Sequence, residues 1–318
     1  MILLWGIPSE PPMRLAVEAA ERAGIEHVVI NQRRAAAYDL VVDPSDPAAG
    51  WLVVDGREIR LGEIDGVYVR IMEPSRLPEQ GVGVDPELVA RSAAFHTLLL
   101  TWVEFAPCRV ANRTAPMASN GSKPYQARLI SDAGFDTPPT LVTDDPDEVA
   151  RFEARHGPLV YKSTSSVRSI VRVLDDPARQ RLHRLAPLPT QFQRCEAGTD
   201  VRVHVVDDAV FAARASSTAI DYRYATSDGV DVELRAMDLP DDVARRCVAL
   251  AAALDLPFAG IDLRERPDGS WVCFEVNPSP GYSWYETEAG LPISDRLVMW
   301  LDGRVAGSDS PNSMSTSS

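Results

Sequence analysis

The 318-residue sequence predicts an α/β protein in which an N-terminal α/β lobe precedes a larger mixed α and β region. Three observations support this prediction. A strand, an amphipathic helix and a second strand follow one another in Ile2–Gly6, Pro12–Ala23 and His27–Ile30. Near the other end, the apolar runs Ala259–Leu263 and Trp271–Val276 flank a Pro-Asp-Gly turn and predict a hairpin. The composition, 45% hydrophobic and 25% charged, is typical of a globular chain with a large core.

The charge and cysteine patterns exclude several classes of protein. The formal net charge is −14, which disfavours non-specific binding to nucleic acid or to an anionic membrane surface. The four cysteines show neither CxxC nor Cys/His metal spacing. No stretch reaches the length of a membrane span, and the N-terminus lacks the pattern of a signal peptide. We therefore expect a cytoplasmic protein with reduced thiols and with no nucleic-acid or membrane partner.

The first lobe is expected over residues 1–110. No glycine-rich dinucleotide motif follows its first strand, so the lobe is interpreted as a scaffold and a substrate wall. Arg70, at a predicted strand end, either holds a carboxylate or phosphate in the cleft or is a surface salt-bridge partner. The other elements of the lobe are predicted at Tyr38–Val42, Trp51–Val54, Val67–Ile71 and the helix Pro86–Phe105, with a hairpin turn at Asp55-Gly56. The apolar stripe of that helix is predicted at Leu88, Val89, Phe95, Leu98, Leu99 and Val103.

The middle of the chain, residues 111–190, is expected to form a small lobe. Lys123-Pro opens a helix that Gly134 stops. A strand, a helix capped by Asp and Pro, and another strand follow, and the last strand ends at Lys162. The pattern thus contains one lysine at a helix start and one at a strand end.

The third region, residues 191–304, contains the predicted hairpin and a candidate metal site. The hairpin places Asp262 across from Glu275, and Asn277 faces the same side as Glu275. Two carboxylates and an amide oxygen suit Mg²⁺ when phosphates supply its remaining ligands. The alternative is that these residues merely end a strand and start a turn. The loop Pro278–Gly281 that follows favours the metal site, whereas the Ser-rich tail from residue 305 is expected to be disordered.

Taken in order, these motifs resemble the ATP-grasp superfamily over most of the chain, from about Asn112 to Leu301. Metal-binding strands of that superfamily carry an Asp and a later E-x-N, as in GIDLRE and FEVN here. The tail N-x-S-P-G…E is similar to its peptide-modifying members, the RimK-like and graspetide-type ligases. The resemblance implies a pre-ATP-grasp lobe followed by a two-lobed ATP-grasp fold, with MgATP held between antiparallel sheets.

The resemblance also implies which residues contact the nucleotide. The two lysines match the phosphate-binding lysines of ATP-grasp enzymes. A strand near residue 191 matches the hinge whose backbone pairs with the edge of adenine, although core packing is an alternative role for Phe192. The implied nucleotide-binding residues are Lys123, Lys162, Ser163, Gln191, Phe192, Gln193 and Asp200.

Three arginines are candidates for the reaction itself. Arg202 and Arg214 lie on predicted strands that are expected to face the cleft. A strand arginine is costly to bury unpaired, so it is either an ion-pair partner of Asp200 or a phosphate ligand. The resemblance makes at least one of the two the charge that stabilises an acyl-phosphate transition state. Arg223, in an Asp-x-Arg motif, is assigned to substrate or phosphate contact.

The loop after the second lysine departs from the family pattern. Many relatives have a glycine-rich phosphate-covering loop there, but Ser163–Ser169 contains no glycine, which restricts how closely the backbone approaches phosphate. Hydroxyl and backbone N–H groups are the alternative hydrogen-bond donors to phosphate, and Arg168 or Arg172 adds positive charge.

The resemblance implies an ATP-dependent ligase that uses one or two Mg²⁺ ions, or Mn²⁺. A substrate carboxylate takes the γ-phosphate, and an amine or hydroxyl then attacks the acyl phosphate to give an amide or ester, ADP and phosphate. The expected acceptor is a peptide, as in graspetide-type RiPP modification or glutamate ligation. The alternatives are a ligase for free amino acids or other small carboxylate–amine pairs, and a noncatalytic ATP-binding module. The protein could form a homo-oligomer under each of these three hypotheses.

Overall fold

The computed structural model describes residues 1–81, 83–163, 171–185, 189–216 and 231–304. Arg223, Arg168, most of the loop after Ser163 and the C-terminal tail lie outside these ranges. Within them the strands form four sheets, and the predicted mixed α/β architecture is confirmed. None of the described helices combines the length and the apolar character needed to cross a membrane.

The N-terminal lobe is built on a parallel sheet that is buried on both faces. Leu3 and Trp5 pack on one side of the first strand, and Ile2 and Leu4 on the other. Continuous apolar strands of this kind are typical of parallel sheets covered on both faces. The strand order is β2 (His27–Asn31), β1 (Ile2–Gly6), β6 (Gly66–Arg70) and β7 (Arg109–Ala111).

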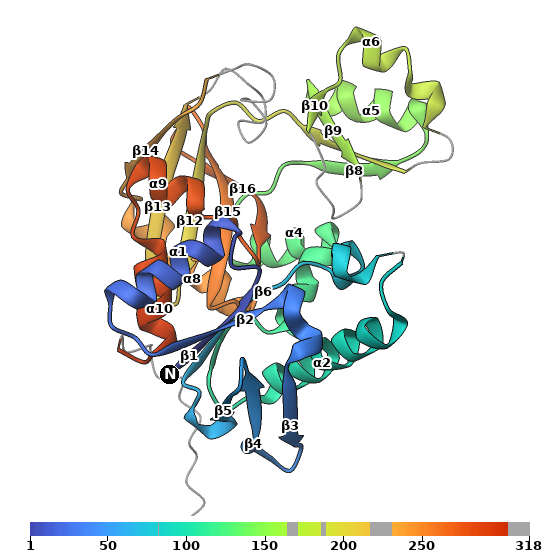
Figure 1. Cartoon of the computed structure of the whole chain (residues 1–318). Helices are drawn as coiled ribbons and strands as arrows, with labels where there is room; N and C mark the ends of the chain where they lie inside the picture. The colour runs from blue at the N-terminus through green and yellow to red at the C-terminus, as the bar shows by residue number, and fades with distance from the viewer. Residues whose placement is uncertain (82, 164–170, 186–188, 217–230, 305–318) are drawn as a thin grey trace, which may run out of the picture.

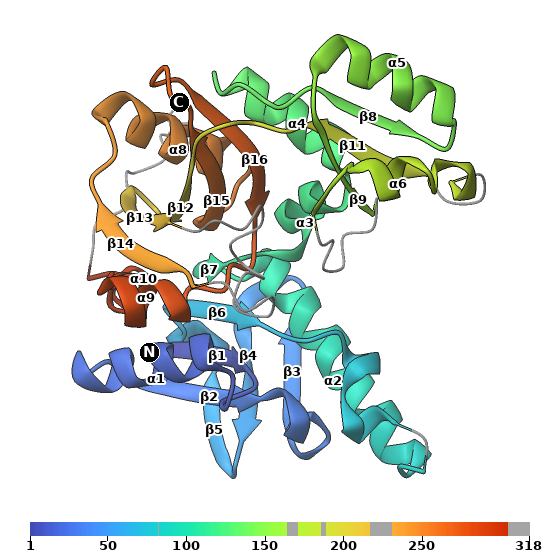
Figure 2. The ribbon, with the colours of Figure 1, turned by 90° about the horizontal axis from the view of Figure 1, so that it is seen from above.

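One face of this sheet is covered by α2 and by a three-stranded meander. The predicted Asp55-Gly56 turn is present, with positive φ at both residues, as a tight two-residue hairpin requires. The predicted apolar stripe of α2 is partly wrong, because Leu88 and Leu98 are exposed. The first turns of α2 project beyond the sheets (Figure 2), and the buried face uses Trp102 instead. These elements are β3 (Asp39–Asp43), β4 (Asp46–Val54), β5 (Arg57–Arg60) and α2 (Pro86–Phe105).

The small lobe, residues 140–194, stands apart from the rest of the molecule (Figure 1) and has its own apolar core. Its helix α5 begins where the sequence predicts, because Asp145 accepts a hydrogen bond from the Asp147 N–H and Pro146 follows the cap. The antiparallel sheet has the order β10 (Arg172–Val173), β9 (Leu159–Ser163), β11 (Thr190–Arg194) and β8 (Thr140–Thr143). Its helices are α5 (Pro146–His156) and α6 (Asp176–Arg179).

The C-terminal lobe is a five-stranded antiparallel sheet with helices on both faces. Valines of β12 pack with α8 on one face, while Ala213 and Ala215 of β13 join the core shared with the N-terminal lobe on the other. The strand order is β14 (Glu233–Met237), β13 (Ala209–Ser216), β12 (Thr199–Val206), β15 (Phe258–Glu265) and β16 (Trp271–Asn277). The helices are α8 (Asp241–Ala253), α9 (Ser283–Ala289) and α10 (Ile293–Leu301).

Helix α4 (Lys123–Asp132), preceded by the short α3 (Thr114–Met117), lies against β16 at the edge of the C-terminal sheet. The Gln126 amide exchanges two hydrogen bonds with the backbone of Val276, at 2.8 and 2.9 Å. This side chain therefore satisfies part of the open strand edge. The expected lobe boundary at residue 190/191 falls inside β11, which belongs to the small sheet.

Candidate active site

The predicted hairpin brings the candidate metal ligands together. In the register of β15 and β16, Asp262 lies opposite Glu275, and Gly260 lies opposite Asn277. All of these positions therefore share one face of the sheet. A bulge between Asp262 and Leu263, where Phe274 is the extra residue, lies directly beside the carboxylate pair. Bulges at such positions re-aim side chains.

Arg202 of β12 joins this face from the neighbouring strand. It lies opposite Asp262, and its Nη1 is 2.6 Å from the Asp262 Oδ1. Only 5% of the Arg202 side chain is exposed. The guanidinium crosses over Gly260, where an added Cβ would come within 2.0 Å of Nη2. Glycine at position 260 is therefore what lets this arginine reach the carboxylate.

A buried histidine lies on the other side of Arg202. The His204 Nε2 accepts a 3.5 Å hydrogen bond from the Arg202 Nε, and the His204 ring lies against Tyr285, with centroids 5.0 Å apart. Burial, followed by the charge of Arg202, holds the pKa of His204 well below its usual value. A neutral imidazole at this position accepts from the guanidinium instead of repelling it.

The strand register shows the partners of two charged residues. Asp200 lies opposite Arg264 and forms a bidentate ion pair with it at 2.7–2.9 Å. Arg214 lies opposite Val201 and so faces away from Arg202 and Asp262. Its partner there is Glu265, at 2.6 Å. Of the candidate arginines in the described ranges, Arg202 is therefore the one on the carboxylate face.

A cavity of about 170 Å³ connects the small lobe to the carboxylate hairpin. Lys123 at the start of α4 and Lys162 near the end of β9 both line it, as does Glu275. Lys162 is a buried residue, with 8% of its surface exposed. The two lysines that the sequence singles out thus lie in one cavity with a candidate metal ligand. Its remaining walls include Gln126, Thr140, Val142, Gln191, Gln193 and Phe274.

The strand β11 contributes side chains, not a free backbone edge, to this cavity. β11 lies between β8 and β9, and the register pairs Gln191, Phe192 and Gln193 with both neighbours. Gln191 and Gln193 line the cavity, whereas Phe192 packs in the core of the small lobe on the opposite face. Core packing, the alternative role for Phe192, is thus what its side chain does. Ser163, at the end of β9, is exposed and is not part of the cavity wall.

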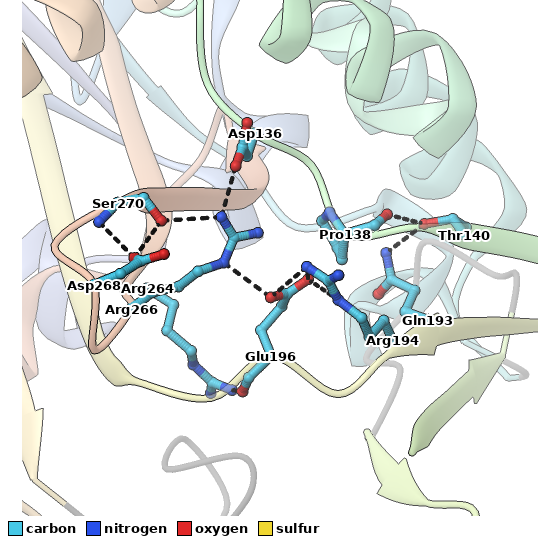
Figure 3. Close-up of polar contacts among 10 residues, drawn as sticks. All are labelled: Asp136, Pro138, Thr140, Gln193, Arg194, Glu196, Arg264, Arg266, Asp268 and Ser270. Atoms are coloured by element: carbon cyan, nitrogen blue, oxygen red, sulfur yellow. Dashed lines mark hydrogen bonds and ion pairs between the residues drawn. The ribbon is translucent and has the colours of Figure 1, made fainter. Parts of the chain in front are cut away.

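Ionic contacts fasten the small lobe beside this cavity (Figure 3). The nearly buried Glu196 carboxylate accepts hydrogen bonds from Arg194, at 2.8 and 3.0 Å, and from Arg266, at 3.0 Å. Arg266 also binds Asp136, at 2.6 Å. We define these four residues as the hinge network. Sequence analysis missed it, although the alternating charges of Arg194-Cys-Glu196 and Arg264-Glu-Arg266 were a signal.

The loop after β16 contacts the candidate metal ligand Asn277. The Asn277 Oδ1 accepts a 2.9 Å hydrogen bond from the Ser279 N–H. Arg70 donates to the Pro280 carbonyl oxygen at 2.8 Å and pairs with Glu10 at 2.8 Å. Of the two roles considered for Arg70, the ion pair is the one observed, with 12% of the Arg70 side chain and 37% of the Glu10 side chain exposed.

These donors fit MgATP. Asp262 and Glu275 supply carboxylate oxygens and Asn277 an amide oxygen, which is the oxygen chemistry that Mg²⁺ prefers. Among the described residues no three His, Cys, Asp or Glu side chains gather as a metal site. A site with two carboxylates and one amide leaves coordination positions for phosphate oxygens, and the cavity lysines provide the positive charge for them.

Comparison with known proteins places the chain in a family. The model of the RimK-like ATP-grasp domain matches residues 121–301. A probable alpha-L-glutamate ligase of Xanthomonas oryzae pv. oryzae (strain MAFF 311018) is 28% identical over 278 residues, which cover 78% of this chain and 93% of that protein.

Two solved structures extend the similarity over nearly the whole chain. The ATP-grasp ligase PsnB, complexed with a phosphomimetic variant of a minimal precursor, Mg and ADP, is 26% identical with a TM-score of 0.76, and 95% of this chain and 98% of that one are covered. A Chryseobacterium gregarium RiPP-associated ATP-grasp ligase in complex with ADP and a leader and core peptide is 20% identical, with a TM-score of 0.79 and coverage of 96% and 97%. The chain belongs to the RimK-like ATP-grasp family, and it is an ATP-grasp ligase.

Proposed function

We propose that this protein activates a peptide carboxylate as an acyl phosphate and joins it to an amine or hydroxyl, with ATP as the phosphate donor. The observation that supports this most strongly is the cavity that unites Lys123, Lys162 and Glu275. Phosphoryl transfer needs positioning and positive charge around the transferring group more than covalent help. Such a cavity offers both.

In this proposal each group has a distinct role. Lys162 and Lys123 hold the nucleotide phosphates, and Gln191 and Gln193 face the base through their side chains. Asp262, Glu275 and Asn277 hold Mg²⁺ or Mn²⁺, which when bound neutralises charge on the phosphates. Arg202, which is paired with Asp262, would supply positive charge to the transferring phosphoryl group. Asp200 acts indirectly, because its carboxylate holds Arg264 on the same face.

The proposed reaction has two steps, phosphorylation of the carboxylate and attack on the resulting acyl phosphate. A substrate carboxylate oxygen forms a bond to the γ-phosphorus as the bond to the ADP oxygen breaks. An amine or hydroxyl then attacks the acyl carbon, loses its proton, and releases inorganic phosphate. Arg202 stabilises the charge of the first step in a site where little of the guanidinium is exposed to water. Arg214 is excluded from this role by its position on the opposite face.

A peptide substrate is supported by two of the similar structures. PsnB is complexed with a variant of its minimal precursor, and the macrocyclase MdnC of Microcystis aeruginosa is bound with the precursor peptide MdnA. The second candidate is a ligase for a free amino acid or another small carboxylate–amine pair. Relatives that are 24–28% identical are named probable alpha-L-glutamate ligases, which supports an amino acid as one of the two substrates and is compatible with either candidate.

The test is acceptor-dependent release of ADP from MgATP by the purified protein, with peptides and free amino acids as candidate substrates. We expect Glu275→Gln to lower the rate at least about 100-fold, because metal coordination stabilises transition-state charge by several kcal/mol. Glu233→Gln is the matched control, since Glu233 lies on the same sheet but pairs with Arg235 at the exposed edge. The control is expected to keep the wild-type rate.

The acceptor that supports turnover chooses between the peptide and small-molecule candidates. Nucleotide binding without ADP release for any acceptor would contradict the ligase proposal and favour the noncatalytic alternative. Equal rates for Glu275→Gln and wild type would show that Glu275 is not a metal ligand.

A further inference from the structure

The loop that follows the metal-site strand is held by the N-terminal lobe. Residues 278–282 connect β16 to α9, and both Pro278 and Pro280 are buried. The Asn112 amide, just after β7, donates to the Pro278 carbonyl oxygen. The Tyr282 hydroxyl donates to the Pro12 carbonyl oxygen at the start of α1 (Pro11–Arg22). The position of this loop therefore depends on contacts with residues far away in the sequence.

Arg70 makes the most central of these contacts. It ends β6, directly opposite Gly6 of β1, and 12% of its side chain is exposed. Its Nη1 donates to the Pro280 carbonyl oxygen at 2.8 Å and lies 3.5 Å from the Ser279 Oγ. Its Nε and Nη2 both donate to the Glu10 Oε1, at 3.0 and 2.8 Å. One planar guanidinium thus bridges the N-terminal lobe and the loop.

The same loop orients a candidate metal ligand. The Ser279 N–H donates to the Asn277 Oδ1 at 2.9 Å, so the direction of the amide oxygen depends on where Ser279 lies. An asparagine at a strand end otherwise has a broad choice of side-chain torsion. A contact that fixes Ser279 and Pro280 therefore fixes Asn277 as well.

From this geometry we propose that Arg70 is a positioning residue, which acts through the loop 278–280 to hold the Asn277 oxygen in the metal site. The proposal rests on the proposed function only in taking Asn277 as a metal ligand. The planar fork of arginine is required, because Arg70 must donate in two directions at once, toward Glu10 and toward the loop. Lysine has a compact ammonium without this planar fork, so it is expected to reproduce the two contacts less well. Glu10 supplies the compensating charge that makes burial of Arg70 tolerable.

The experiment measures binding of Mn²⁺ by electron paramagnetic resonance, in the presence of a nonhydrolysable ATP analogue. We expect Arg70→Met to weaken Mn²⁺ binding about 10-fold, which corresponds to roughly 1.4 kcal/mol, and Arg70→Lys to weaken it several-fold. Binding of the metal-free nucleotide, measured in EDTA by calorimetry, is expected to stay within about twofold of wild type. The split between the two measurements separates positioning of the metal site from a general loss of structure.

Arg22→Met is the matched control. Arg22 also reaches from the N-terminal lobe to the C-terminal lobe, where it pairs with Asp295 at 2.7 Å, but it lies on α1 and not at the loop. This variant removes a contact between the same two lobes and is expected to bind Mn²⁺ as wild type does. If both variants weaken Mn²⁺ binding equally, Arg70 acts only through the packing of the lobes, and the proposal is overturned.

A double-mutant cycle tests whether Arg70 acts through Asn277. With Asn277→Ala already present, Arg70→Met is expected to cause little further loss of Mn²⁺ binding, because the group that Arg70 positions is absent. An equal loss in both backgrounds would contradict the proposal, as would unchanged Mn²⁺ binding in Arg70→Met. If Arg70→Met does not fold, Arg70→Lys and the same cycle decide the question. Wild-type protein that binds Mn²⁺ and nucleotide but never releases ADP would contradict the ligase function and leave this inference standing.

Discussion

The N-terminal lobe shares an apolar core with the C-terminal sheet, whereas the small lobe has a core of its own. In the shared core, α10 packs on α1 of the N-terminal lobe, and Phe258 of β15 lies against Tyr68 of β6 and Tyr282 of the loop. Gly66 approaches the end of α10 so closely that an added Cβ would lie 2.5 Å from the Leu301 carbonyl oxygen. We call these two lobes together the N–C unit.

Ion pairs hold the segments that link the small lobe to that unit. The segments on either side of it run through the hinge network of Asp136, Arg194, Glu196 and Arg266 (Figure 3). Apolar burial is non-directional and scales with area, so the shared core holds its two lobes as one body. Ion pairs at a partly exposed junction contribute less and depend on salt and geometry.

The two junctions support different parts of the candidate site. Asp262 and Asn277 lie on the sheet face and loop that the N–C unit builds, while Lys162, Gln191 and Gln193 belong to the small lobe. Metal coordination tolerates little misplacement, whereas a nucleotide has to enter and leave. We infer that the apolar junction holds the metal site rigid, and that the hinge network sets the approach of the lysine-bearing sheet.

The largest expected effect is on the apolar junction. Phe258→Ala removes a side chain that is 1% exposed and contacts residues of both lobes, so we expect the free energy of unfolding of the N–C unit to fall by about 3–5 kcal/mol. All six tryptophans lie outside the small lobe, at positions 5, 51, 102, 271, 284 and 300. Denaturant unfolding followed by tryptophan fluorescence therefore reports on this unit.

Phe192→Ala is the matched control, because Phe192 is equally buried but lies in the core of the small lobe. We expect it to leave the fluorescence transition within about 1 kcal/mol of wild type, and to speed amide exchange in β9 and β11. If Phe192→Ala shifts the fluorescence transition as much as Phe258→Ala does, the two junctions are not independent and the comparison fails.

The next effect is on pH dependence. Burial lowers the pKa of His96 in α2, and it lowers the pKa of His204 in β12 more strongly. A histidine whose pKa is lowered in the folded state stabilises the fold above about pH 6.5, and this stability is lost as the pH falls, because the unfolded state binds the proton first. We expect the N–C unit to lose up to about 1.4 kcal/mol per histidine between pH 6.5 and 5.5.

This prediction is measured as the slope of unfolding free energy against pH, again by tryptophan fluorescence. His96→Asn is expected to flatten the slope, whatever its effect on stability at pH 7.5. A slope equal to that of wild type would show that other groups account for the acid sensitivity.

The smallest effect is expected at the hinge network. Glu196→Gln removes the charge that Arg194 and Arg266 share. Because Arg194 is partly exposed, we expect the interaction energy of the hinge network to fall by only about 1–2 kcal/mol. We expect the Kd for the ATP analogue to rise about 3- to 10-fold, as measured by calorimetry, with little change in the fluorescence transition. Glu148→Gln is the control, since its partner Arg151 is on the surface of α5 in the same lobe. Weaker binding in both variants would exclude the hinge as the cause.

Much of the fold was accessible from local patterns. The strands of the N-terminal lobe, α2, and the turn at Asp55-Gly56 follow from periodicity and turn chemistry. The position of Arg214 was accessible as well but was predicted wrongly. A two-residue turn at Asp207-Asp208 pairs Val206 with Ala209, which already puts Arg214 and Arg202 on opposite faces, since neighbours along a strand alternate.

In the hairpin of β15 and β16, the turn at Arg266–Gly269 sets the register next to it, with Leu263 opposite Cys273. That register alone would place Asp262 opposite Phe274, and the bulge at Phe274 is what brings Asp262 opposite Glu275. The choice of partners for Arg202, Asp200 and Arg70 is different. Arg202 is 60 residues from Asp262, and Arg70 is 210 residues from Pro280. A one-residue slip between such distant strands would exchange every partner, so these pairs come from the packing of the whole sheet and of the lobe behind it.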